Sequence, residues 1–179
     1  MTLKMYLRAA PVALALVLSA CGGGSKSDET ATAYCPAPFT VQDAGRLTHF
    51  KDGPGRDPRD VEYDAVLTGA GTSCTLRRNQ MDVNLIMRVA VSAGPSVVAG
   101  QTRVPYFVRV IGSSGQVVQG QDFTADFKLS SANPRGQSQE ELTLTLPFNQ
   151  ISELGSYLIA VGLKPSMEEL EYNRLAGQR

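Results

Sequence analysis

Apolar and polar side chains alternate along much of the chain between residues 61 and 163. Successive side chains of a β-strand point to opposite faces, so this period of two predicts strands with one buried face and one exposed face. The clearest runs are 61–68, 82–92, 122–130 and 140–148. The runs 104–111 and 157–163 are apolar on both faces, which indicates central strands or strands whose second face meets another surface. A shorter strand is expected at 74–76.

Residues typical of turns separate these runs. Gly69-Ala70-Gly71 precedes the short strand, Gly112-Ser113-Ser114-Gly115 has the composition of a hairpin loop, and Asn133-Pro134-Arg135-Gly136 that of a longer loop. About seven or eight short strands joined in this way predict an all-β fold, an antiparallel immunoglobulin-like β-sandwich. A closed barrel is the alternative architecture. The absence of tryptophan and the wide spacing of the cysteines argue against a true antibody-type domain.

The C-terminal part has a different pattern. Ser166 and Glu169 have the spacing of a capping box, and the acidic residues that follow Ser166 suit the positive end of a helix dipole. We therefore expect one short C-terminal helix that closes an open end of the sandwich. Glu168, Glu169 and Glu171 are interpreted as a solvated helix face rather than as a pair of catalytic carboxylates.

The N-terminal part resembles an export signal. Lys4 and Arg8 flank the start of an apolar run, 9–20, which is shorter than the roughly 20 residues that a membrane-spanning helix needs. The run ends in Leu18-Ser19-Ala20-Cys21, which resembles the lipobox of bacterial lipoproteins. The resemblance implies that Cys21 is acylated, with palmitate among its acyl chains, and becomes the first residue of the mature protein.

The expected organisation has four parts. Residues 1–20 form the lipoprotein signal peptide, 21–33 the lipidated cysteine and a flexible tether, 34–174 the β-sandwich domain and 175–179 a tail. The tether prediction depends on 22–33, which holds no bulky apolar side chain. Gly22 stands where an aspartate would favour retention in the inner membrane, so we expect the inner leaflet of the outer membrane, with the domain facing the periplasm. The inner membrane is the alternative address.

Charge excludes two kinds of partner. The chain has 17 basic and 17 acidic residues, and removing the signal peptide takes away only Lys4 and Arg8, which leaves a small negative excess. Such a chain offers no basic surface for nucleic acid and no polybasic segment for anionic lipid heads. Attachment to the membrane is therefore expected through covalent lipid alone, because several acyl chains hold a protein firmly.

The three cysteines divide into one lipidation site and one pair. Cys35 and Cys74 are predicted to form a disulfide in an oxidising compartment, which would stabilise the fold by about 4 kcal/mol in the chain-entropy model. A metal site is the alternative, but the chain has a single histidine, His49, and no Cys-x-x-Cys pair. We expect no metal and no cofactor.

Candidate chemistry is sparse. His49 lies between apolar neighbours, and no Gly-x-Ser-x-Gly sequence is present, so His49 is interpreted as structural and no catalytic residue is assigned. The run 53–60 holds Arg56 and Arg59 among glycines, prolines and aspartates. These arginines could bind a phosphate or carboxylate. The alternating charges favour a rigid connection in which arginines and aspartates pair with each other.

A second resemblance spans roughly residues 34–174. It is to a group of small uncharacterised proteobacterial lipoproteins with no assigned activity, and it is carried by Tyr34-Cys35-Pro36, Gly45-Arg46-Leu47-Thr48-His49-Phe50, Gly55-Arg56-Asp57, Pro105-Tyr106-Phe107-Val108 and Leu170-Glu171-Tyr172-Asn173-Arg174. The resemblance implies one exported domain that ends near residue 174.

The function expected from the sequence is non-enzymatic binding or scaffolding of other envelope proteins. Apolar residues opposite the predicted core set would form the contact surface: Val66, Phe107, Ile111 and Leu158. A second sheet or a loop that covers these positions is the structural alternative. The alternative function is an envelope hydrolase or a small-ligand carrier with a pocket at the mouth of the sandwich.

Overall fold

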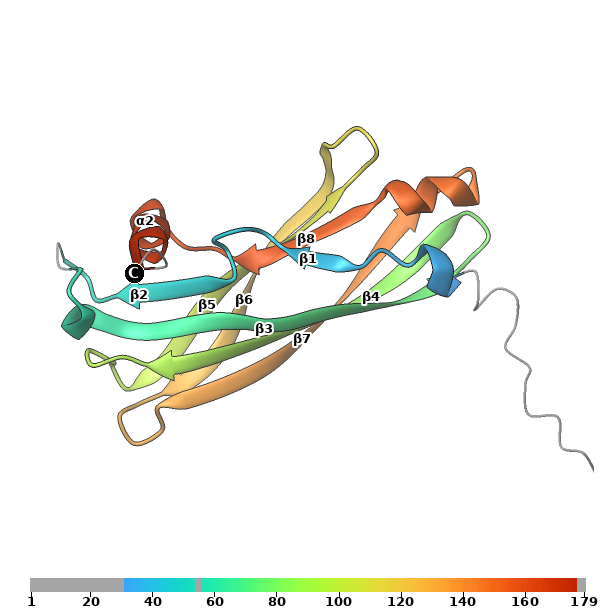
Figure 1. The fold of residues 1–179 in the computed structure, drawn as a ribbon. Coiled ribbons are helices and arrows are strands. Elements are labelled where there is room, and N and C mark those ends of the chain that lie inside the picture. Colours follow the sequence, from blue (N-terminus) through green and yellow to red (C-terminus); the bar gives the residue numbers. More distant parts are fainter. Residues whose placement is uncertain (1–30, 54–55, 177–179) are drawn as a thin grey trace, which may run out of the picture.

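The computed structural model describes residues 31–53 and 56–176. Its eight strands form two four-stranded sheets that pack face to face (Figure 1). The first sheet has the order β1-β8-β5-β6, with bounds Pro38–Thr40, Leu158–Leu163, Gly100–Ile111 and Val117–Leu129. The second has the order β2-β3-β4-β7, with bounds Arg46–Phe50, Val61–Leu76, Gln80–Ala93 and Arg135–Pro147. The predicted all-β sandwich with a short C-terminal helix is confirmed.

The core lies between the sheets and follows the alternation in the sequence. Every second residue of β4 from Met81 to Val91 is buried, and the facing strand β5 buries every second residue from Val104 to Val110. In β6 and β7 full burial begins only at Ala125 and Leu144. Among the earlier apolar positions of these two strands, Phe123 and Leu142 are partly buried and Val117 and Val118 are exposed.

Several strand boundaries differ from the sequence prediction. Residues 61–68 and 74–76 were expected to be separate strands, but they belong to the single strand β3, which pairs with β4 as far as Leu76. Gly69 and Gly71 therefore do not form a turn, because the ladder to β4 continues through them with one irregularity after Leu67. The short strands β1 and β2 were not predicted, and β1 pairs with β8 in parallel, unlike the other strand pairs.

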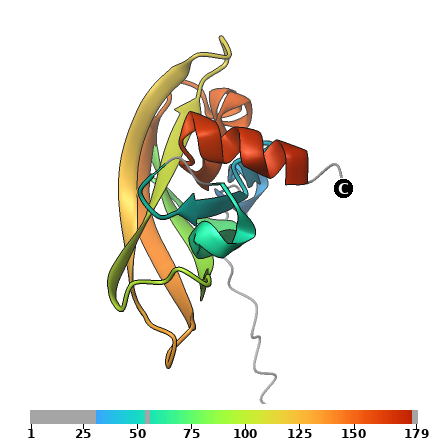
Figure 2. The same ribbon diagram turned by 90° about the vertical axis from the view of Figure 1, so that its left-hand side faces the viewer.

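The helix α2, Met167–Ala176, begins with the predicted capping box. The Glu169 carboxylate accepts a hydrogen bond from the Ser166 amide (2.7 Å), and the Ser166 hydroxyl accepts one from the Glu169 amide (3.3 Å). The helix lies beside β2 at one end of the molecule (Figure 2), where Tyr172 packs edge-to-face on Phe50. The predicted solvated face is wrong for Glu169, which is only 8% exposed because it turns toward His49.

Two short 3-10 helices, η1 (Pro58–Asp60) and η2 (Ile151–Ser156), lie between strands, and residues 31–34 form a helical turn before β1. Cys35 and Cys74 lie at disulfide-bonding distance, with their Cα atoms 5.6 Å apart, a typical separation for a disulfide. The bond ties the segment before β1 to β3. Within the described residues, no helix has the length and apolar character required to cross a membrane. The predicted signal peptide, the lipidation site Cys21 and residues 22–30 of the tether lie outside the described residues.

Candidate functional site: the His49 cleft

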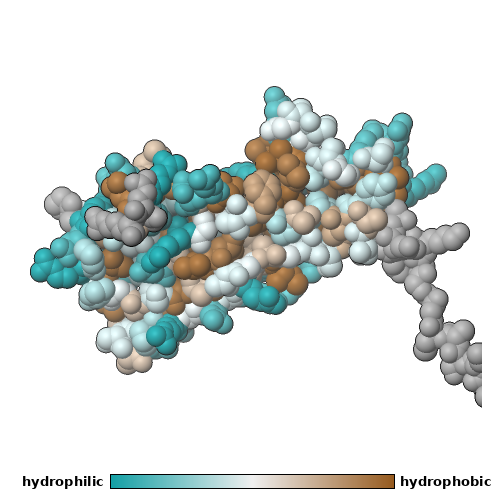
Figure 3. All heavy atoms as spheres, viewed as in Figure 1, coloured by the Kyte–Doolittle hydropathy of each residue, from teal (hydrophilic) through white to brown (hydrophobic). Residues whose placement is uncertain are grey.

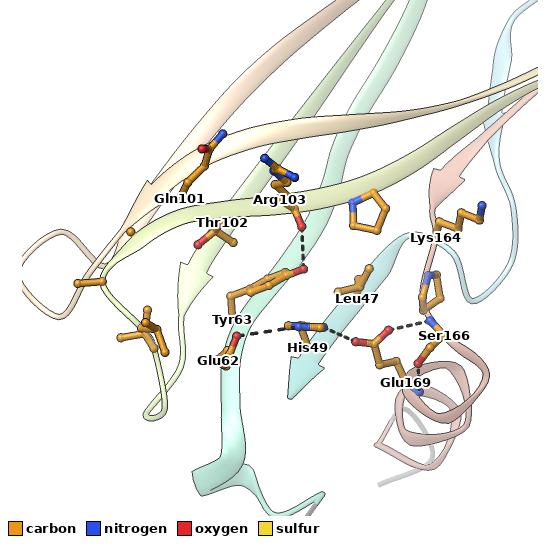
Figure 4. A pocket seen from close by; sticks show the side chains of 16 residues that line it. Leu47, His49, Glu62, Tyr63, Gln101, Thr102, Arg103, Lys164, Ser166 and Glu169 are labelled. Carbon is orange, nitrogen blue, oxygen red and sulfur yellow. Dashed lines mark hydrogen bonds and ion pairs between the residues drawn. The ribbon is translucent and has the colours of Figure 1, made fainter. Parts of the chain in front are cut away.

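A cleft of about 990 Å³ opens between the start of β5, the strands β2 and β3, and the link from β8 to α2. We call it the His49 cleft (Figure 4). It exists because β8 ends at Leu163, opposite Tyr106, whereas β5 continues to Gly100. On the side of β5 that faces away from β6, the first sheet thus lacks a strand beside residues 100–105. Leu47, His49 and Tyr63, which point inward from β2 and β3, line the cleft at this gap.

His49 is held by two carboxylates and a ring. Its Nδ1 lies 2.7 Å from Oε1 of Glu169, its Nε2 lies 3.9 Å from Oε2 of Glu62, and its ring stacks on Tyr63 with centroids 4.8 Å apart. The hydrogen bond to Glu169 raises the pKa of His49 above its usual value; burial opposes this, and the charges of Glu169, Glu62 and Asp52 support it. His49 therefore favours the charged imidazolium form more than a free histidine does.

Glu169 is the other member of this pair. Burial would raise the pKa of its carboxyl group, but the hydrogen bonds from His49 and from Ser166 outweigh burial, so the pKa lies below its usual value. The result is a charge-assisted hydrogen bond between β2 and α2, residues that are 120 positions apart in the sequence. This pair fixes the helix to the sandwich and forms one wall of the cleft.

Tyr63 joins the two sheets at the gap. Its hydroxyl group donates a 3.0 Å hydrogen bond to the main-chain carbonyl of Arg103 on β5. Burial, with the negative charges of Glu169 and Glu62, raises the pKa of the phenol. Tyr63 therefore stays neutral and acts as a hydrogen-bond donor. Its hydroxyl group takes the place of the main-chain amide that a further strand of the first sheet would offer to the Arg103 carbonyl.

The described side chains that contact His49 are two carboxylates and a phenol ring. Nucleophilic catalysis by a histidine needs a hydroxyl or thiol within hydrogen-bond reach of the free ring nitrogen. Within residues 31–53 and 56–176, the only side chains that hydrogen-bond or ion-pair with His49 are those of Glu169 and Glu62. The same ranges hold no group of three histidine, cysteine or carboxylate side chains suited to a metal ion.

The predicted contact residues fall on two different faces. Leu158 and Ile111 are paired in register on the outer face of the first sheet, and Phe107 lies on the same face of β5. Leu158 is 50% exposed, whereas Phe107 and Ile111 are partly buried, with the Arg109 guanidinium over the Phe107 ring. Val66 lies on the outer face of the opposite sheet, so the four residues do not form one surface.

Other apolar side chains extend the outer face of the first sheet. Phe39, Val117 and Val118 are exposed, and Phe39 and Val117 pair in register with Ala160 and Ile111. Figure 3 shows apolar groups near the middle of this side of the molecule. The alternation in the sequence did not identify Phe39, because the three-residue strand β1 is too short to show a period.

The two arginines of the loop before β3 are engaged within the chain. Arg59 binds Asp57 (Nε to Oδ1 2.9 Å), and Asp57 also caps η1, so the pKa of its carboxyl group is lowered by these hydrogen bonds. Arg56 contacts Glu168 of α2 and lies over the ring of Phe50. Arg59 thus pairs with an aspartate of the same run, whereas Arg56 pairs with a glutamate of α2.

Comparison with known proteins gives no family for this chain. No protein-family model matches it, and no curated protein matches it. The function is therefore argued from the geometry of the cleft, the outer faces of the sheets and the N-terminal sequence.

Proposed function

We propose that this chain is a lipid-anchored protein of the cell envelope that binds another envelope protein without catalysing a reaction. The lipobox-like sequence ending at Cys21 supports anchoring in the inner leaflet of the outer membrane, facing the periplasm. The Cys35–Cys74 pair supports an oxidising compartment, where disulfides persist. Neither a metal nor a cofactor is part of the proposal.

The observation that carries this proposal is the position of the His49 cleft. The first described residues lie at one end of the sandwich and α2 lies at the other (Figure 1). Ser166 and Glu169, at the start of α2, line the cleft, which therefore lies at the same end as the helix. A domain anchored through its N-terminus would therefore hold the cleft away from the membrane, where a partner in the periplasm can reach it. The outer apolar face around Leu158 is a second contact surface on the side of the domain.

The size of the cleft favours a second candidate function, the binding of a small molecule. Its volume of about 990 Å³ is at the upper end of the range for small-molecule sites, roughly 300–1,000 Å³. The paired His49 and Glu169 would give such a site a polar end. A small-ligand carrier or a hydrolase is therefore the second candidate function.

Site-specific photo-crosslinking in the native envelope distinguishes these functions. A photoreactive residue would replace Val98, which is 71% exposed and lines the cleft, or Thr143, which lies on the outer face of β7. We expect a discrete protein adduct from position 98 and none from position 143. Equal adducts from both positions would contradict binding through the cleft. A cleft that crosslinks no protein but retains a small molecule through purification would favour the carrier.

A further inference from the structure

The cleft is bordered by an open β-sheet edge. β5 pairs with β6 along its whole length, but its pairing with β8 stops at Tyr106. Beyond this point the Lys164 amide donates one last hydrogen bond to the Pro105 carbonyl (2.9 Å), and the chain then turns at Pro165 toward α2. Pro105 has no amide to return that bond, so the ladder ends there.

The direction of the main-chain groups follows from this last hydrogen bond. In an antiparallel strand the amide and carbonyl of one residue point to the same side, and the side changes at each step. Because the Pro105 carbonyl points toward β8, the amides and carbonyls of Arg103 and Gln101 point into the vacant position beside β5. The Tyr63 hydroxyl donates a hydrogen bond to the Arg103 carbonyl. Among the described residues, no strand pairs with residues 100–104 on the side of β5 that faces away from β6.

The surroundings of this edge suit an extended chain. A strand placed beside β5 would lie over Leu47 and Tyr63, which line the cleft but are only 1% and 6% exposed, and near Val97 and Val98. Every second side chain of that strand would face this apolar and aromatic lining. At the inner end of the cleft the Glu169 carboxylate is hydrogen-bonded to His49, whereas the Glu62 carboxylate lies 3.9 Å from the ring and is the less engaged of the two. The cations at the rim, Arg103 and Lys164, each lie near an aspartate of β6.

We propose that the His49 cleft binds an extended peptide segment of a partner protein, which pairs with Gln101 and Arg103 as an added strand of the first sheet. The Glu62 carboxylate selects a segment with a basic side chain that reaches it. Main-chain hydrogen bonds then supply affinity, and alternate side chains supply specificity, as in other cases of strand addition. This inference rests on the proposed binding role of the cleft and adds the chemistry of the partner.

The test uses the purified mature chain and random ten-residue peptides displayed on beads. We expect selection to enrich peptides with alternating apolar residues and at least one lysine or arginine. For a selected peptide, Arg103→Pro, which removes an amide facing the cleft, is expected to weaken binding at least tenfold. Thr124→Pro is the matched control, because it removes an amide on the opposite edge of the same sheet, and binding should stay within about twofold.

Two further variants separate the main chain from the side chains. Arg103→Ala keeps the amide and should weaken binding less than Arg103→Pro does. Glu62→Gln should abolish the preference for a basic residue. Hydrogen exchange provides a readout that needs no variant: the amides of Gln101 and Arg103 should exchange rapidly in the free protein and slowly in the complex. This measurement also decides the question if Arg103→Pro fails to fold.

Several results would overturn strand addition. These are the absence of any selected peptide that competes at the cleft, unchanged binding by Arg103→Pro, and unprotected Gln101 and Arg103 amides in the complex. If position 98 still crosslinks a protein in the envelope under these outcomes, the proposed binding function stands and only the strand mode fails. If position 98 crosslinks nothing either, both proposals fail.

Discussion

Replacing Glu169 by glutamine tests how the C-terminal helix is fixed to the sandwich. The change keeps the size of the side chain and an oxygen that can accept from the Ser166 amide, but it removes the charge that meets His49 at 2.7 Å. Hydrogen bonds to charged groups contribute about 1.5–3 kcal/mol. The Glu169 side chain is 11% exposed but His49 is 43% exposed, so solvent screening reduces the expected loss to about 1–2 kcal/mol.

The pH dependence of this loss follows from the two pKa shifts. The pKa of His49 is raised, so its contribution is complete below the usual value of 6.5 and is lost as the pH rises through the raised value. The pKa of Glu169 is lowered, so its contribution is complete above the usual value of 4.5 and is lost as the pH falls through the lowered value. The stability difference between wild type and Glu169→Gln should therefore be largest between about pH 4.5 and pH 6.5.

Guanidinium unfolding followed by far-ultraviolet circular dichroism, from pH 4 to pH 9, measures this difference. Glu168→Gln is the matched control, because Glu168 is the preceding residue of the same helix, is 69% exposed, and contacts Arg56 at the surface. An exposed ion pair contributes little, so the control should lose about 0.5 kcal/mol or less. A pH-independent loss in Glu169→Gln, or an equal loss in Glu168→Gln, would refute the assigned role of the pair.

Three further predictions address the anchor, the disulfide and the outer face. Cys21→Ser should abolish incorporation of labelled palmitate, and continued labelling would reject Cys21 as the lipidation site. Replacing Cys35 and Cys74 together by serine should lower the unfolding free energy by about 2–4 kcal/mol without changing membrane attachment, whereas two free thiols in protein from the envelope would contradict the bond. Leu158→Glu should fold with a stability loss below about 1 kcal/mol and should impair binding, whereas Phe107→Glu should lose about 1–3 kcal/mol because Phe107 is half-buried. Thermal unfolding measures the stability of both variants, and the crosslinking assay measures their binding. An unfolded Leu158→Glu would place Leu158 in the core.

The sequence alone determined the fold class and the inner faces of the long strands. A period of two sustained over several residues allows only one face to be buried, so the alternation by itself places every second residue from Val83 to Val91 in the core. The capping-box spacing at Ser166 located the start of α2. The pairing of Cys35 with Cys74 followed from the number of cysteines once Cys21 was assigned to lipid.

Only the tertiary structure determined the cleft and the environment of His49. The local pattern of residues does not reveal which strands become neighbours. The sequence contains Pro105 and Pro165, but it does not show the gap beside β5 at which both prolines lie. Likewise, the contact between His49 and Glu169 spans 120 positions and depends on where α2 lies, which is why Glu169 was assigned to solvent. Side-chain alternation is a property of neighbouring residues, whereas the cleft arises from the unequal lengths of strands that meet only after folding.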